Sequence, residues 1–201
     1  MDRRAILKYT AYVTGYAITA PLTSAFLSGC KAEPTAPDYV PVYFSETTYQ
    51  NLVAVVDTML PATSTPGAVE IGVPAFMDLV VGKYTEEEDR LKMMNGFESW
   101  LTTVQNNAGT PYHALPAEEQ LKLLNALDQE AIATAESLEG KILSEDEMKA
   151  LQPWWLDMKA LVINGYFASE KIGTEVLAYD PVPGPYQGCI PLSNVGKTWS
   201  L

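Results

Sequence analysis

The sequence has very little of the chemistry that enzymes place in their active sites. Its 201 residues contain a single histidine, His113, and two cysteines, Cys30 and Cys189. No set of His, Cys and carboxylate residues has metal-ligand spacing, and neither Gly-x-Gly-x-x-Gly nor a phosphate-binding loop occurs. Motifs for haem attachment and for an iron–sulfur cluster are missing as well. We therefore expect no catalytic, cofactor-binding or metal-binding residues in this chain, and we expect His113 to be a solvated loop residue.

Basic residues and strand patterns are scarce too. The chain has 13 Lys and Arg against 25 Asp and Glu, a net charge of −12. This excess of acid argues against nucleic-acid binding, which depends on neutralising phosphates, and against a basic membrane-binding patch. No stretch alternates apolar and polar residues over the length of a strand, so we predict an all-α fold with little or no sheet.

The N-terminus has the pattern of an export signal. Residues 2–8 resemble a twin-arginine signal, the address of a route that exports folded proteins. Residues 9–29 are apolar but contain Thr, Tyr and Gly, and Pro21 interrupts them. A transmembrane anchor, the alternative, needs about 20 strongly apolar residues. We therefore assign residues 1–29 to a signal peptide. Its key residues are Arg3, Arg4, Leu7 and Lys8.

The signal ends in Leu27-Ser28-Gly29-Cys30, which resembles a bacterial lipobox. Lipidation would make Cys30 the new N-terminus and anchor the chain durably without spanning the membrane. The alternative is ordinary cleavage after Ala25, which would leave Cys30 as a free thiol. Residues 30–44 are predicted to form the lipidated start and a proline-rich tether. We therefore expect the protein on the periplasmic side of the bacterial envelope.

Residues 45–178 are predicted to form a compact domain of several helices. A helix stripe of Met148, Leu151, Trp155, Met158 and Val162 has the spacing of a core face. Pro153 lies within that stripe and should kink the helix or begin a new one. Ser45 should cap a helix over 46–60, which Pro61 ends, and Gly72-Val73-Pro74 should open a second helix to about 81. A Thr85–Glu88 capping box should open a third helix to about 106, and a Ser144–Glu147 capping box should open the last one. Between these two, Pro116 should open a helix with an apolar stripe of Leu121, Leu124, Leu127, Ala131 and Ile132.

Trp154 and Trp155 are adjacent in one of these helices. Adjacent positions on a helix do not share a face. We therefore expect one indole in the core and the other near the surface or in an interface. A stacking platform for a sugar or quinone is the alternative.

Residues 179–201 differ in character from the helical body. They contain four prolines and three glycines, too many for a helix or a central strand. They are also too apolar for a disordered tail. This extended segment should lie on the helical body or on another protein. Cys189 within it is predicted to form an intermolecular disulfide or remain a free thiol, or else to be buried and inert.

Five short stretches occur in a fixed order between about residues 45 and 200. They are VVDTMLP (55–61), TPGA (65–68), GVPAFMD (72–78), NGYFASE (164–170) and YDPVPGPYQGC (179–189). In these stretches the chain resembles the small subunit, subunit 3, of the gluconate 2-dehydrogenase family, which is shared with related membrane-bound sugar and polyol dehydrogenases.

The resemblance implies a non-catalytic accessory subunit of an oxidoreductase complex. An FAD-bearing large subunit of the glucose–methanol–choline (GMC) type would oxidise the substrate, and a cytochrome c subunit with haem c often takes the electrons. The small subunit would escort and stabilise the large one. Tyr186, Cys189 and Trp199 are the candidates for partner contact, because aromatic anchors concentrate in interfaces, and Cys189 is the candidate for an inter-subunit disulfide. The alternative is a free-standing, lipid-anchored periplasmic protein that binds a ligand between its helices.

Overall fold

The computed structural model describes residues 39–182, 184–185 and 189–200. These residues belong to the unit Ala36–Leu201. Several sequence-predicted residues lie outside the described part of the chain: Arg3, Arg4, Leu7 and Lys8 of the export signal, the lipidation site Cys30, and Tyr186.

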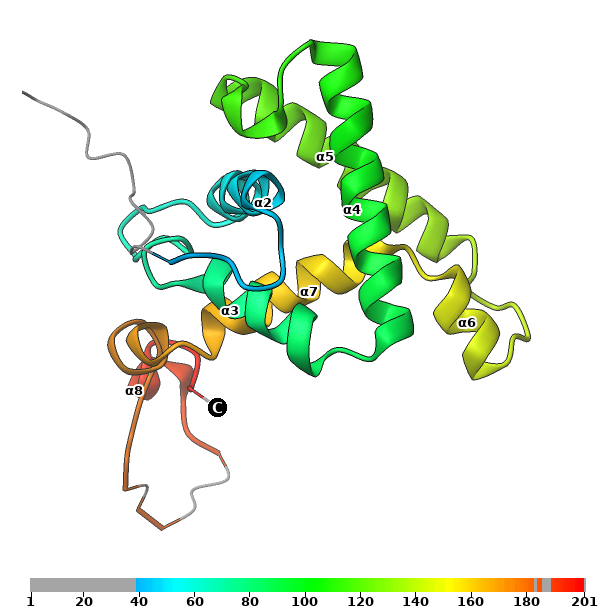
Figure 1. Cartoon of the computed structure of the whole chain (residues 1–201). Helices are drawn as coiled ribbons and strands as arrows, with labels where there is room; N and C mark the ends of the chain where they lie inside the picture. The colour runs from blue at the N-terminus through cyan, green and yellow to red at the C-terminus, as the bar shows by residue number, and fades with distance from the viewer. Residues whose placement is uncertain (1–38, 183, 186–188, 201) are drawn as a thin grey trace, which may run out of the picture. The chain divides into compact units, whose positions relative to one another are not determined.

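The described residues form an all-α domain, as predicted (Figure 1). Between 39 and 200, outside the undescribed gaps, no strand occurs, and one isolated bridge joins Ala178 to Trp199. The helices are α2 (Glu46–Met59), α3 (Val73–Leu79), α4 (Glu87–Ala108), α5 (Ala117–Glu136), α6 (Glu145–Leu151), α7 (Trp154–Phe167) and α8 (Leu192–Val195), with π-helices η1 (Val80–Tyr84) and η3 (Ile172–Val176) and the 3₁₀ turn η2 (Tyr112–Ala114).

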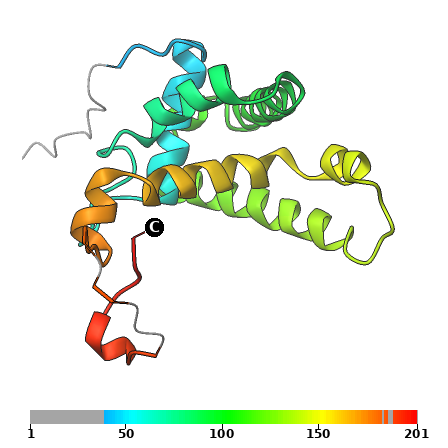
Figure 2. The ribbon, with the colours of Figure 1, turned by 90° about the horizontal axis from the view of Figure 1, so that it is seen from below.

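Helix α7 lies at the centre of the domain and packs against α3, α4 and α5 (Figures 1 and 2). Its residues Trp155, Met158 and Val162 are buried, as the stripe predicted. Met148 and Leu151 are instead about half exposed. The reason is that α6 ends at Leu151 and Pro153 caps the start of α7, so the stripe is divided between two helices.

The stripe on α5 is also narrower than predicted. Leu124 and Ala131 are buried and Leu127 packs against the core, whereas Leu121 and Ile132 are 49% and 40% exposed. Successive residues of a helix are rotated by about 100° around its axis, so the side chains of Leu121 and Ile132 lie to one side of the face that Leu124, Leu127 and Ala131 share. Helices α2 and α7 therefore cover only part of the apolar surface of α5.

Two of the three predicted caps form. The Ser45 hydroxyl accepts a hydrogen bond from the Thr48 backbone N–H, and Ser144 makes the complete capping box with Glu147. The Thr85 box is wrong, because the preceding helix continues as η1 to Tyr84. Thr85 Oγ1 donates to the Val80 carbonyl at 3.0 Å, and α4 begins at Glu87 without a side-chain cap. Thr85 therefore closes one helix instead of opening the next.

Glycines within helices allow aromatic rings to lie directly on the backbone. A Cβ at Gly96 of α4 would come within 2.3 Å of the Trp154 ring, and one at Gly82 of η1 within 1.9 Å of the Tyr43 ring. A helical glycine costs about 1 kcal/mol relative to alanine. At Gly96 that cost is offset by the close approach of α7 to α4.

Candidate functional site

The residues that lead into the helical body are held by one buried carboxylate. Asp78 in α3 has no exposed surface. Its Oδ2 accepts from the Tyr39 hydroxyl at 2.6 Å and the Val42 N–H at 2.7 Å. Its Oδ1 accepts from the N–H of Phe44 at 2.7 Å and of Tyr43 at 3.1 Å. We call residues 39–44 with Asp78 the entry clamp, because it fixes the point at which the chain joins the domain.

The entry clamp shifts the pKa of two groups. Burial acts to raise the pKa of Asp78, but the hydrogen bonds from Tyr39, Phe44, Val42 and Tyr43 outweigh it, so the pKa falls below 3.8. Burial and the hydrogen bond to Asp78 raise the pKa of the Tyr39 hydroxyl far above its usual value. Asp78 is therefore ionised at neutral pH although it is buried, because donors surround it.

His113 is part of the folded body, so the prediction of a solvated loop residue was wrong. It lies in the 3₁₀ turn η2. Its backbone N–H donates to Oδ1 of the buried Asn51 at 3.0 Å, and its Nδ1 lies 3.1 Å from the same oxygen. The Asn51 amide nitrogen donates to the Thr47 carbonyl at 2.9 Å. Asn51 thus ties η2 to helix α2, and His113 has a structural position.

The C-terminal segment returns to the body only at its ends. The Ala178 N–H donates to the Thr198 carbonyl and the Ser200 N–H donates to the Ala178 carbonyl, both at 2.8 Å. The described residues between these ends project away from the helices (orange to red in Figures 1 and 2). Their exposed apolar side chains include Tyr179 at 55%, Val182 at 81% and Leu192 at 76%.

Two of the predicted partner-contact residues can be placed on this segment. Cys189 is exposed and unpaired within the described part of the chain, so the alternative of a buried, inert cysteine is wrong. Trp199 is about half exposed, and its backbone forms the bridge to Ala178. The two residues therefore occupy one surface segment that a partner could reach.

The adjacent tryptophans differ in burial, as expected. Trp155 is 2% exposed, and its indole N–H donates to Asp128 Oδ1 at 2.8 Å. Lys159 Nζ donates to both oxygens of Asp128, at 2.7 and 2.8 Å. Burial acts to raise the pKa of Asp128, but the bonds from Lys159 and Trp155 lower it overall. Trp155 is thus a satisfied core residue, whereas Trp154 is partly exposed.

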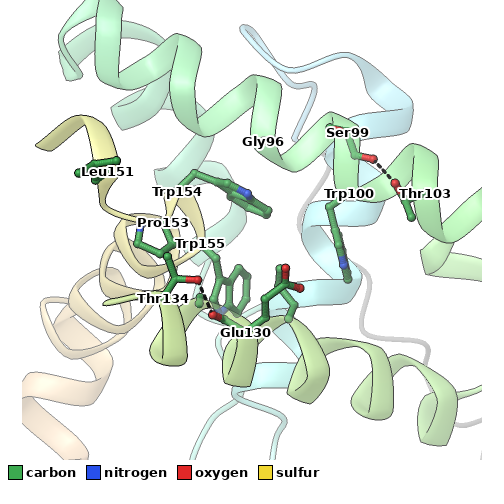
Figure 3. A pocket seen from close by; sticks show the side chains of 12 residues that line it. Gly96, Ser99, Trp100, Thr103, Glu130, Thr134, Leu151, Pro153, Trp154 and Trp155 are labelled. Carbon is green, nitrogen blue, oxygen red and sulfur yellow. Dashed lines mark hydrogen bonds between the residues drawn. The ribbon is translucent and has the colours of Figure 1, made fainter. Parts of the chain in front are cut away.

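Both indoles nevertheless line one cavity, which the sequence did not predict. Their ring centroids lie 6.0 Å apart in an edge-to-face arrangement. The cavity has a volume of about 320 Å³ and lies between α4, α5 and the start of α7. Figure 3 shows Trp154 and Trp100 on two sides of it, with Glu130 of α5 below. We call this the tryptophan pocket, defined by Trp100, Glu130, Trp154 and Trp155.

A second cavity lies next to the tryptophan pocket. This cavity of about 300 Å³ lies between α4 and α5 and shares Trp100, Leu127 and Glu130 with the pocket. The two cavities are therefore neighbours on the same side of α4 and α5. A side chain entering the tryptophan pocket would meet indole rings, threonine hydroxyls and the carboxylate of Glu130.

The described residues contain neither a metal site nor a membrane-spanning helix. No group of three or more His, Cys, Asp or Glu side chains in this part of the chain is placed to hold a metal ion. No helix among the same residues is long and apolar enough to cross a membrane.

Sequence reasoning missed the residues that organise these sites. Asp78 stands in the motif GVPAFMD, where an acidic residue follows an apolar run. That position is unusual, but its four partners lie 34 to 39 residues earlier in the chain. Glu130 gives no signal of its own, because charged residues are ordinary on an exposed helix face.

Comparison with known protein families gave a match that covers most of the helical body. The family model described as gluconate 2-dehydrogenase subunit 3 matches residues 46–184, well over half of the chain. This confirms the family predicted from the short motifs. The match ends before Cys189 and Trp199. No curated protein and no solved structure matches the chain.

Proposed function

Because the chain belongs to the gluconate 2-dehydrogenase subunit 3 family, we propose that it is the non-catalytic small subunit of a periplasmic dehydrogenase complex. Its partner is an FAD-dependent large subunit of the GMC type that oxidises a sugar or alcohol, and a cytochrome c subunit with haem c is a third component. The chain directs the folded export of the large subunit, stabilises it and tethers it to the membrane. The substrate is chosen by the large subunit.

The family match carries this proposal, because the family is named as one subunit of a dehydrogenase. The sequence supports the division of labour. Arg3 and Arg4 resemble an address for folded cargo, and the chain lacks the motifs that would bind a cofactor of its own. A partner that loads FAD in the cytoplasm would need such an address.

The C-terminal segment supports a role in binding this partner. Its exposed apolar residues Val182 and Leu192 project from the body and would be protected from water in a complex. Cys189 on the same segment is exposed and could reach a thiol of the large subunit. Tyr186 and Trp199 are the proposed aromatic anchors.

The entry clamp supports a role in tethering. A chain anchored through a lipid on Cys30 would transmit any pull on the membrane side to residues 39–44. The four hydrogen bonds to Asp78 hold residues 39–44 on α3, so a force on the tether would act on α3. The helical body would therefore stay folded while its tether moves.

Export can be tested by co-expressing the large subunit with this chain carrying Arg3→Lys and Arg4→Lys. The substitutions keep the charge but remove the paired guanidinium groups, so we expect periplasmic dehydrogenase activity to fall to that of cells lacking this chain. Cells carrying Lys122→Arg serve as the control, since Lys122 is an exposed residue of α5 and lies outside the signal. Activity that still appears in the periplasm at the unmodified level would show that the escort role is wrong.

A further inference from the structure

The tryptophan pocket combines aromatic walls with an acidic floor. Trp154 lies against Gly96, where three ring atoms are within 2.3 to 2.7 Å of the position that a Cβ would take, so this side of the ring rests on α4. Trp100 stands on the other side of the cavity and is fixed by a stacked contact with Phe97, with 6.3 Å between the ring centroids (Figure 3). Both indoles are therefore held in place before any ligand enters.

The charged side chain that lines the tryptophan pocket is acidic. Among the described residues, Glu130 is the only charged one in its lining, and no lysine or arginine lines it. Glu130 takes part in none of the four ion pairs found in the same part of the chain. Its carboxylate points into the cavity in Figure 3. The net charge of −12 adds a general attraction for cations.

Three polar groups beside the pocket already donate their protons within the protein. Thr103 Oγ1 donates to the Ser99 carbonyl and Thr134 Oγ1 to the Glu130 carbonyl, both at 2.9 Å. The indole N–H of Trp155 already donates to Asp128. The two threonine hydroxyls can still accept hydrogen bonds, but none of these three groups has a second proton to donate. The Ser99 hydroxyl and the indole N–H groups of Trp100 and Trp154 also line the pocket and can donate, so the preference for a cation rests on the aromatic faces and on the Glu130 carboxylate.

We propose that the tryptophan pocket binds one basic side chain, a lysine or arginine, of the catalytic subunit. Indole rings attract an ammonium or guanidinium group, and a carboxylate adds charge-assisted hydrogen bonds. The volume of about 320 Å³ is enough for one long side chain. This inference rests on the proposed function for the identity of the partner, but the chemistry of the pocket can be tested without it.

The first experiment uses the purified protein alone. Its indole N–H signals are followed by NMR during titration with choline, with N-acetyl-arginine amide and with 3,3-dimethylbutan-1-ol, the neutral isostere of choline. We expect both cations to shift the signals of Trp100 and Trp154 but not of Trp199, which lies outside the pocket. The alcohol should bind roughly three- to tenfold more weakly than choline. Equal binding of choline and the alcohol would overturn the proposal.

Glu130→Gln removes the charge while keeping the shape of the side chain. It should weaken cation binding roughly three- to tenfold. Glu136→Gln, at the exposed end of the same helix and outside the pocket, is the matched control and should have no effect. Cation binding that is unchanged by Glu130→Gln would also overturn the proposal.

The second experiment measures assembly with the catalytic subunit. We expect Glu130→Gln to weaken co-purification and Glu136→Gln to leave it unchanged. If free cations bind but both variants assemble like the unmodified chain, the pocket takes a small organic cation instead, and the partner assignment is wrong. If even the unmodified chain fails to assemble, the proposed function fails, and the titration alone decides the chemistry of the pocket.

Discussion

Asp78→Asn should destabilise the domain far more than a surface change of the same charge. The carboxylate accepts four hydrogen bonds, from the Tyr39 hydroxyl and from three consecutive backbone N–H groups at 42–44. An asparagine keeps one acceptor oxygen, but its NH₂ group replaces the other oxygen and faces the two donors that this oxygen had bound. Two of the four donors are thereby left facing a donor.

The magnitude follows from which donors can return to water. Val42 and Tyr43 are exposed residues, so their N–H groups can be solvated after a small movement. Phe44 is buried, and an unsatisfied buried N–H costs about 1–3 kcal/mol. If the amide oxygen instead stays with Phe44 and Tyr43, the bonds from Tyr39 and Val42 are lost, and the two bonds that remain no longer have a charged acceptor, which costs a similar amount. We therefore expect Asp78→Asn to lower the free energy of unfolding by about 2 kcal/mol.

The assay is urea unfolding of the purified protein, followed by circular dichroism. Asp57→Asn on the partly exposed side of α2 removes the same charge and is the control. Because the pKa of Asp78 is lowered in the folded state, its contribution is complete above pH 3.8, the unperturbed value, and is lost as the pH falls below it. The difference between the unmodified protein and Asp78→Asn should thus be constant near neutral pH and shrink below about pH 4. Equal unfolding free energies for the two variants would refute the role of the entry clamp.

Three further predictions concern single contacts. Gly96→Ala should cost about 2 kcal/mol of unfolding free energy through the clash with Trp154, despite the better helix propensity of alanine. The same change in a Trp154→Leu background should cost much less, and an equal cost in both would contradict the contact. Ser144→Ala removes the complete capping box and should cost about 1 kcal/mol, with faster amide exchange in α6 and unchanged exchange in α7. On non-reducing electrophoresis of the purified complex, this chain and the large subunit should migrate as one band that Cys189→Ser separates; two bands without reductant would exclude the disulfide.

The local signals in the sequence predicted the helices well. Ser45 and Ser144 cap the helices they were expected to cap, and Pro153 separates α6 from α7. These features depend on a few neighbouring residues, since a cap needs only a side-chain oxygen next to free N–H groups. The Thr85 box failed because the helix before it is longer than its local sequence pattern indicates. The π-helix η1 runs on to Tyr84, so Thr85 stands at the end of that helix and α4 begins only at Glu87.

The sequence by itself determined the all-α fold and the family, whereas the division into a signal, a tether, a helical body and an apolar C-terminal segment stays a prediction. Composition, periodicity and short motifs carry that information, because each can be read within a few turns of the chain. Only the tertiary structure shows what Asp78 and Asn51 bind and which cavity Glu130 lines. Their partners lie far away in sequence, at residues 39–44, in η2, and on α4 and α7. The tryptophan pair shows the physical reason most directly: adjacent residues on a helix should diverge, yet both indoles line one cavity, because Gly96 on another helix leaves room for Trp154.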